Sequence, residues 1–283
     1  MRFVKMNGAG NDFIILDNRD GAYDTAQLSA LAKTVCHRHL SVGADGLMAI
    51  VNAEGDADFR MLFFNTDGSV GEMCGNGARC ICRYGYEFGL AGERQRIETT
   101  AGIVTGERID RRNYRIRLND PTVLEVDYPV ELEGKTWACA YVELGDPGLP
   151  HAVVPLSGLR DRSFEELRPL GRALRSHPAF PKGANVNFYE LIGPDHLVEK
   201  TFERGVEDFT LACGTGCGAT AVSLILRGKI LGNRVEIDMP GGHLSVSICI
   251  DGEGVHDVLL TGPTAVVDRG ETALPGRQIN KEL

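Results

Sequence analysis

Short runs in which apolar and polar residues alternate predict several strands along this chain. Alternation is clearest at Tyr114–Leu118, where every second residue is an arginine, so we expect this strand to have one solvent-facing side. The runs that are typical of strands are Ile14–Leu16, Phe59–Phe63, Tyr114–Leu118, Ala140–Leu144, Val235–Ile237 and Leu244–Ile250.

Four other segments have apolar residues at helical spacing and lie between the predicted strands. These segments are Thr25–His39, Gly77–Phe88, Ser163–Ser176 and Gly216–Arg227. Ser163 and Glu166 have the spacing of a capping box, which marks a helix start. Gly89 and Gly228 follow two of the segments directly, where helix-terminating glycines belong. The chain is therefore predicted to combine α and β structure throughout.

One short string occurs twice, as Cys-Gly-Asn-Gly from Cys74 and as Cys-Gly-Thr-Gly from Cys213. Its flanks also agree: a phenylalanine lies 10 or 11 residues before the cysteine, a glycine 28 residues after it, and a Pro-Thr pair 47 or 50 residues after it. Four matches in the same order predict two related halves. We place the first half at 1–119, completed by a returning C-terminal strand within 265–283, and the second at 120–264.

Composition narrows the classes of partner. The 283 residues carry a net charge of −9 and only 30 Lys and Arg, which argues against nucleic acid and anionic membranes as partners. No apolar stretch is long enough to span a bilayer and the start lacks a signal peptide core, so we expect a cytoplasmic protein. Eight cysteines in a chain of this length are typical of reduced thiols, most of them packed in the core.

Each repeated string predicts a cysteine at the N-terminus of a helix. Unpaired backbone N–H groups and the helix dipole favour anions there, so such a thiol can have a lowered pKa and the same helix end can bind a carboxylate. The glycines would let a ligand approach the backbone closely. Two such ends facing one cleft suit a reaction that removes a proton from one face of a carbon and returns one to the other, which is racemisation or epimerisation.

Other interpretations explain less of the sequence. Gly214–Ala219 fits the dinucleotide pattern G-x-G-x-x-A, but the segment before it is rich in charge, unlike a buried parallel strand. No Gly-Lys-Ser/Thr follows either glycine string, which excludes a P-loop. Cys36–His39 and Cys80–Cys82 lack the paired C-x-x-C spacing of structural zinc, so no metal is expected. A cysteine hydrolase with His151 as base leaves the second string unexplained.

The residues as a whole resemble the diaminopimelate epimerase family. The opening Lys5–Phe13 is similar to the N-terminal signature of the family. Phe64–Ser69 followed by Met73–Cys80 is similar to its most specific string, and Phe202–Gly205 followed by Ala212–Gly216 is similar to the second. Pro240–Gly242 is similar to a third, so the matches span most of the chain.

The resemblance implies an α+β fold of two pseudo-symmetric mixed α/β domains, each a curved, mostly antiparallel sheet or barrel around a helix, with the active site in the cleft between them. It implies a cofactor-independent isomerase that converts LL- to meso-diaminopimelate, forms a homodimer and acts in lysine and peptidoglycan precursor synthesis. Cys74 would take the α-proton of the LL substrate and Cys213 would return one. The matching substrate-binding residues are Asn11, Asn65, Gly75, Asn76, His151, Asn185, Glu203, Arg204, Gly214 and Thr215. No cofactor and no metal is implied.

Three departures from the family pattern leave the choice of substrate open. The segment Gly145–Pro150 before His151 is three residues longer than usual and carries Asp146 in place of asparagine. Gly46 and Phe209 also replace residues that are frequent in the family. The alternatives are a racemase or epimerase of another amino acid, such as proline or hydroxyproline, and an inactive small-molecule-binding relative. For Asp12 and Asp67 we expect structural turn roles.

Overall fold

The computed structural model describes residues 1–71 and 74–273, and divides into two compact units. Unit 1 is Met1–Ile116 together with the chain from Pro263, and unit 2 is Arg117–Gly262. The C-terminal strand therefore returns to unit 1, although the last part of the predicted segment, 274–283, lies outside the described residues. No helix of the described chain is both long and apolar enough to cross a membrane.

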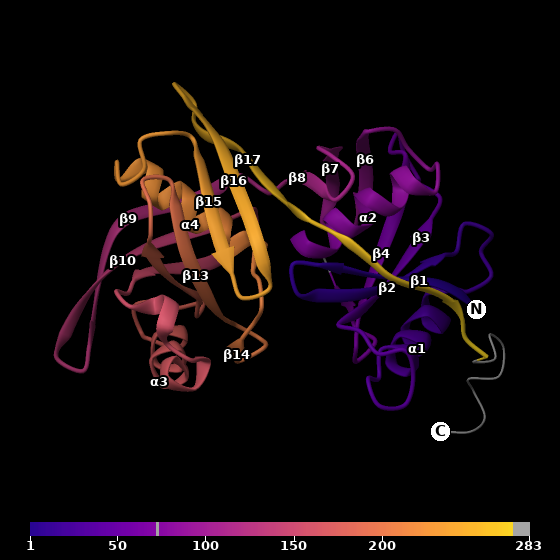
Figure 1. Ribbon diagram of the computed structural model, residues 1–283, viewed down its shortest axis with the longest axis horizontal. Helices are drawn as coiled ribbons and strands as arrows, with labels where there is room; N and C mark the ends of the chain where they lie inside the picture. The colour runs from indigo at the N-terminus through magenta and orange to yellow at the C-terminus, as the bar shows by residue number, and fades with distance from the viewer. Residues whose placement is uncertain (72–73, 274–283) are drawn as a thin grey trace. The chain divides into compact units, whose positions relative to one another are not determined.

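Unit 1 is a mixed sheet with a helix on each face (Figure 1). Its elements are β1 (Arg2–Gly8), β2 (Asn11–Asp17), α1 (Thr25–Val35), β3 (Gly46–Val51), β4 (Phe59–Asn65), β5 (Val70–Gly71), α2 (Gly75–Glu87), β6 (Arg94–Thr99), β7 (Gly102–Arg108), β8 (Asn113–Arg117) and β18 (Ala265–Glu271). The pairs β2–β3 and β4–β6 are parallel, and the other pairs are antiparallel, including β18 with β1.

Unit 2 repeats this plan. Its elements are β9 (Pro121–Leu132), β10 (Lys135–Leu144), β11 (Leu149–Pro155), η1 (Leu159–Asp161), α3 (Phe164–Arg175), β12 (Asn185–Leu191), β13 (His196–Glu203), β14 (Asp208–Phe209), α4 (Gly214–Leu226), β15 (Arg234–Met239), β16 (Gly242–Asp251) and β17 (Gly254–Pro263). Its parallel pairs, β11–β12 and β13–β15, correspond to the pairs β2–β3 and β4–β6 of unit 1.

Apart from the short η1 of unit 2, the two units correspond element by element. Two strands, a helix, two strands, a two-residue strand, a second helix and three strands follow in the same order from β1 to β8 and from β10 to β17. One further strand completes each unit at the same place, since β18 pairs with β1 and β9 pairs with β10. The strand pairing therefore follows the same plan in both units.

The second helix of each unit is the centre of its core. In α2 the buried residues Cys80–Cys82 and Tyr84 pack with strand residues such as Phe13 and Tyr114. Almost all of α4 is buried, and it contacts β10, β11, β12, β15 and β16. A helix that is apolar on all sides is stable only in such a surrounded position. Packing of the buried part of α2, and of nearly all of α4, fixes the position and direction of each helix and therefore of its N-terminus.

Local signals in the sequence agree with the observed helix boundaries at most ends. Ser163 and Glu166 form the predicted capping box, and Gly89 and Gly228 have φ values of +69° and +64° as helix-terminating glycines do. The helix predicted to reach His39 ends at Val35, because the chain turns there and the N–H of Gly43 hydrogen-bonds to the Val35 carbonyl. The one-sided strand was correct: in β8, Tyr114 and Ile116 are buried while Arg117 is exposed.

Candidate active site

Cys74 and Cys213 occupy the same local position in their units. Each is the N-cap of a 13-residue helix, α2 or α4, and each has an extended backbone, with φ and ψ of −124° and 120° at Cys74 and −122° and 105° at Cys213. An N-cap residue lies beside the first backbone N–H groups of its helix, which have no partner within the helix. The repeated string thus places a sulfur at an anion-favouring helix end in each unit.

The second glycine of each string lies against packed side chains of its own unit. A Cβ on Gly77 would lie 2.0 Å from Met48 Cε, and one on Gly216 would lie 2.3 Å from Asn187 Oδ1. Neither distance is possible for real atoms, so both glycines let the first helical turn lie directly against the sheet. This close packing sets the distance between each N-cap cysteine and the sheet of its unit.

Strand pairing brings the predicted substrate-binding residues of unit 1 together at the ends of adjacent strands. Asn11 begins β2, Gly46 begins β3 and Asn65 ends β4, and Gly46 is the direct partner of Asn65. α2 begins ten residues after Asn65, on the same connection. Asn65 Nδ2 donates to Ser69 Oγ at 2.9 Å, which holds the amide toward the turn before Cys74.

A chain of side-chain hydrogen bonds holds Asn76, in the first turn of α2, and Asn11, at the start of β2. Arg79, which is fully buried, donates from Nη2 to Asn76 Oδ1 at 2.7 Å, and Asn76 Nδ2 donates to Asn11 Oδ1 at 2.6 Å. Asn11 Nδ2 in turn donates to Asp45 Oδ2 at 3.1 Å. Sequence reasoning missed Arg79 and Asp45, although a lone arginine inside the buried face of a helix is unusual. Together the four side chains fix how Asn11 and Asn76 point.

Asp67 has the turn role we expected, whereas Asp12 lies in β2 and is held by ion pairs instead of closing a turn. Burial raises the pKa of Asp12, but hydrogen bonds and charges of Arg38 and Lys5 outweigh it and the pKa is lowered overall. Both Arg38 and Lys5 lie within ion-pair distance of this carboxylate. Asp67 Oδ1 accepts hydrogen bonds from the N–H and hydroxyl of Ser69, which closes a turn and lowers the pKa of Asp67.

Unit 2 gathers its predicted residues in the same way. The parallel pairing of β11 with β12 makes His151 the partner of Asn185, and β13 runs back beside them to end at Glu203. Asn185 Oδ1 accepts a hydrogen bond from the Arg204 N–H at 2.8 Å. The Arg204 guanidinium donates to the Lys182 carbonyl at 2.9 Å. The ends of three adjacent strands thus lie together, as at the corresponding edge in unit 1.

The environment of Cys213 raises its pKa, contrary to our expectation for a thiol at a helix N-terminus. Cys213 is 7% exposed, and burial together with the neighbouring Glu203 carboxylate disfavours the thiolate. The Thr215 hydroxyl, whose oxygen is 3.6 Å from the sulfur, and the N–H of Gly216 oppose this effect but do not reverse it. Cys213 is therefore held as a thiol, the form that can give a proton. Gly214 is the first residue of α4.

Glu203 has a raised pKa of its own. Burial raises the pKa of Glu203, and hydrogen bonds from Thr210 and Cys213 oppose that rise. Thr210 Oγ1 lies 2.6 Å from Glu203 Oε1, so the carboxyl is fixed beside the thiol. We therefore expect each group to depend on the charge of the other.

Replacing Glu203 by glutamine is expected to lower the pKa of Cys213, because a neutral amide no longer repels the thiolate. Alkylation of Cys213 by iodoacetamide between pH 7 and pH 9, followed by mass spectrometry of its peptide, should become faster by roughly tenfold for each unit by which the pKa falls. Alkylation of the exposed Cys249 in the same sample is the internal control. An unchanged or slower rate at Cys213 would contradict this electrostatic account.

His151 is fully buried, and burial lowers its pKa to about 3. Its Nδ1 accepts a hydrogen bond from Asn187 Nδ2 at 3.2 Å, so the proton of the neutral ring lies on Nε2. Nε2 has no hydrogen-bond partner among the described residues. Because its pKa is so low and its Nδ1 already accepts a hydrogen bond, this ring is a poor general base, which argues against the cysteine hydrolase interpretation.

A buried polar cluster beneath α4 was not predicted from the sequence. The Thr201 hydroxyl lies 3.1 Å from Asn187 Oδ1 and 3.2 Å from Glu199 Oε1. Asn187, Glu199 and Thr201 are all fully buried, and burial raises the pKa of Glu199 to about 7. The signal that could have found them is the appearance of polar residues at inward positions of the otherwise apolar strands β12 and β13.

The remaining alternatives also fit the structure poorly. The strand before the second glycine string, β14, has two residues and is antiparallel to β13, unlike the long parallel strand of a dinucleotide-binding unit. Cys36, Cys80 and Cys82 are buried, and burial raises the pKa of each thiol to about 12. They behave as core residues.

Comparison with known proteins identifies what the chain is similar to. The family model described as diaminopimelate epimerase matches residues 3–120 and 145–267. The diaminopimelate epimerase of Aquifex aeolicus is 38% identical over 280 residues, covering 95% of this chain and 97% of the relative. That of Carboxydothermus hydrogenoformans is 37% identical and covers 96% of this chain and 99% of the relative.

Solved structures with low sequence identity share the fold. A phenazine biosynthesis protein of the PhzF family from Bacillus anthracis has a TM-score of 0.74 at 17% identity, covering 96% of this chain and 98% of that one. A probable proline racemase from Agrobacterium radiobacter has a TM-score of 0.68 at 16% identity, covering 98% of this chain and 94% of that one. The mixed α/β architecture predicted from the sequence is confirmed.

Proposed function

This chain belongs to the diaminopimelate epimerase family, and from that premise we propose that it converts LL-diaminopimelate to meso-diaminopimelate. The observation that carries the proposal is the equivalent placement of two cysteines, one in each unit, at the N-cap of a buried helix with the same backbone conformation. Inverting a carbon by proton transfer needs one group that accepts a proton and one that gives a proton on opposite faces. Two matched thiols provide this pair.

In the proposed reaction the Cys74 thiolate removes the α-proton and the Cys213 thiol donates its proton to the opposite face. The C–H electron pair stays on the α-carbon during the transfer and forms the new C–H bond, so no electrons are gained or lost. Cys74 ends as a thiol and Cys213 as a thiolate, and solvent exchange restores the starting state. The raised pKa of Cys213 supports its role as the donor in this direction.

The helix ends are proposed to bind the α-carboxylate. The backbone N–H groups of Gly75 and Asn76 in α2, and of Gly214 and Thr215 in α4, are at the positions where anions bind helices. Negative charge develops on this carboxylate as the proton leaves, so these donors stabilise the transition state more than the substrate. The distal end of the substrate is proposed to meet Asn11, Asn65, Asn185, Glu203 and Arg204.

His151 is proposed to bind substrate through its buried Nε2–H. This donor has no hydrogen-bond partner among the described residues, and burying such a group without a partner is unfavourable. Asn187 holds the ring so that the proton stays on Nε2. The lengthened segment before His151 is the turn between β10 and β11, where Asp146 is exposed.

A substrate panel tests the proposal. The purified protein is incubated with LL-diaminopimelate, L-proline and trans-4-hydroxy-L-proline under reducing conditions, and the stereoisomers are separated by chromatography. We expect meso-diaminopimelate to form and the two proline substrates to remain unchanged, because Glu203 and Arg204 suit a substrate with a charged distal end. Inversion of a proline substrate alone would favour the alternative amino-acid racemase, and no inversion of any substrate would favour a binding protein.

The same proposal includes a cytoplasmic homodimer that acts in lysine and peptidoglycan precursor synthesis. Light scattering of the purified protein tests the dimer, with a mass near 61 kDa expected from twice the 30.7 kDa chain. Cell fractionation tests the location.

A further inference from the structure

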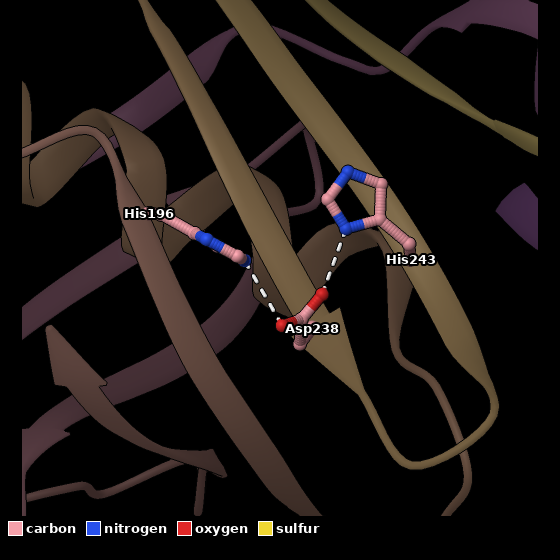
Figure 2. A group of neighbouring side chains, drawn as sticks. All are labelled: His196, Asp238 and His243. Atoms are coloured by element: carbon pink, nitrogen blue, oxygen red, sulfur yellow. Dashed lines mark hydrogen bonds and ion pairs between the residues drawn. The ribbon is translucent and has the colours of Figure 1, made fainter. Parts of the chain in front are cut away.

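Two histidines and an aspartate meet on the outer face of unit 2, outside the proposed active site. His196 is the first residue of β13, Asp238 lies on β15 and His243 lies on β16 (Figure 2). Asp238 and His243 are direct partners in the β15–β16 ladder, and His196 is the partner of Glu236 in the parallel β13–β15 ladder. Three adjacent strands therefore fix the backbone beneath all of these side chains.

Both imidazoles point a ring nitrogen at the same carboxylate. His196 Nε2 lies 2.9 Å from Asp238 Oδ2, and His243 Nδ1 lies 2.8 Å from Asp238 Oδ1 (Figure 2). The three ligand atoms lie within 4.8 Å of one another. Tetrahedral zinc with bonds of about 2.0–2.1 Å separates its ligand atoms by about 3.3 Å, so small side-chain rotations on a fixed backbone would open a site of the right size.

The other nitrogen of His243 has the partner that metal-binding histidines usually have. His243 Nε2 lies 2.8 Å from Glu236 Oε2, and Glu236 is in turn held by Arg234 at 2.6 Å. A carboxylate that accepts a hydrogen bond from the far nitrogen fixes the ring and makes the near nitrogen a better ligand. The contact therefore prepares Nδ1 of His243, and not Nε2, to bind a cation.

His196 contributes a nitrogen without a satisfied hydrogen bond. Its Nε2 is buried and, although close to Asp238, is not aligned for a hydrogen bond with any described residue. The rings of His196 and His243 are nearly perpendicular, with centroids 5.8 Å apart, so their ring planes do not block each other. The charged groups of the cluster, Glu236, Asp238 and Arg234, sum to −1 when both histidines are neutral, which favours a cation.

We propose that His196, Asp238 and His243 form a binding site for one divalent transition-metal ion of the zinc type, with Glu236 supporting His243. Two imidazoles and one carboxylate are a ligand set that such ions prefer, and three protein ligands leave a fourth position for water. Metal binding would displace protons from the imidazoles, so affinity should fall as the pH is lowered.

The site is separate from the proposed reaction. Seven residues of extended chain, about 23 Å, separate His196 at the start of β13 from Glu203 at its end. The ion would join three neighbouring strands of unit 2 and stabilise the folded state by binding to it alone. Epimerase activity should therefore survive chelation, so failure of this proposal and failure of the proposed function give different results.

Zinc titration of the untagged, chelator-treated full chain at pH 7.5, in competition with a chromogenic chelator, tests the proposal. We expect one equivalent of zinc whose affinity falls at least tenfold in His196→Gln and His243→Gln, and 10- to 100-fold in Glu236→Gln. The matched control is His256→Gln, which changes a histidine of β17 that is held by Asp251 of β16 and by Asp257, and which should leave this equivalent unchanged.

Two further readouts separate this site from thiols and from unfolding. Cobalt(II) bound by nitrogen and oxygen should lack the intense near-ultraviolet absorption of a cobalt–thiolate bond. Zinc should raise the Tm of the parent protein but not that of the doubly substituted His196→Gln/His243→Gln protein. Equal zinc affinity in the parent and in all three cluster variants would overturn the proposal and leave the cluster as a network of ion pairs.

Discussion

Alanine at Cys74 or at Cys213 is expected to abolish the conversion of LL- to meso-diaminopimelate, with turnover falling by about 10³-fold or more. A positioned acid or base contributes about 10²–10⁴ to a rate, and each substitution removes one of the two groups without offering a substitute. Turnover is measured by chromatographic separation of the stereoisomers. Residual activity above a tenth of that of the parent in either variant would contradict the assignment of two thiols.

Serine variants at the same positions separate proton transfer from packing. A hydroxyl is close to a thiol in size but is a far weaker acid, so Cys74→Ser and Cys213→Ser should fold and still fail to invert the substrate. Cys249→Ser is the matched control, because this exposed cysteine lies on β16 and has no place in the proposed reaction. It should keep full activity.

Replacing Glu199 by glutamine is expected to change how stability depends on pH. Burial raises the pKa of Glu199 from 4.5 to about 7, so the folded chain holds a proton that the unfolded chain releases at pH 4.5. The unfolded state binds fewer protons between these values, and stability therefore falls as the pH rises from 4.5 to 7. The full loss above pH 7 is about 3 kcal/mol, from 1.36 kcal/mol for each pKa unit.

The measurement is the free energy of unfolding of parent and Glu199→Gln at pH 5 and pH 8, from denaturant titration. The parent should lose roughly 2–3 kcal/mol more than the variant between the two pH values, because a part of the full loss has already occurred at pH 5. Glu165→Gln, at an exposed position of α3, is the control and should follow the parent. Parallel pH dependence in parent and Glu199→Gln would show that Glu199 does not keep its proton in the folded state.

The sequence predicts best those features that depend on residues close together in the chain. The start of α3 at Ser163 follows from its capping box, and the ends of α2 and α4 follow from Gly89 and Gly228. The repeated cysteine string correctly predicts two helices with cysteine at the N-cap. Four sequence matches that keep their spacing predict two related halves, but the order of elements that the two units share is visible only in the structure.

The features that could not be predicted depend on strand register and burial. His151 and Asn185 become neighbours only through the parallel pairing of β11 with β12, and nothing in their spacing of 34 residues indicates it. His196, Asp238 and His243 meet through two further ladders. The direction of the Cys213 pKa shift was also missed, because a helix N-terminus can be seen in a sequence whereas a buried Glu203 beside the sulfur cannot.

The central claim, inversion by two different thiols, is tested most directly by the reaction of LL-diaminopimelate in deuterium oxide, stopped at low conversion. The proton removed by Cys74 stays on one side of the substrate while Cys213 donates from a solvent-equilibrated thiol on the other. We predict that the meso product carries deuterium at its inverted α-carbon while the remaining LL substrate carries almost none. Product that retains the original hydrogen, or LL substrate labelled as fast as product forms, would contradict the account.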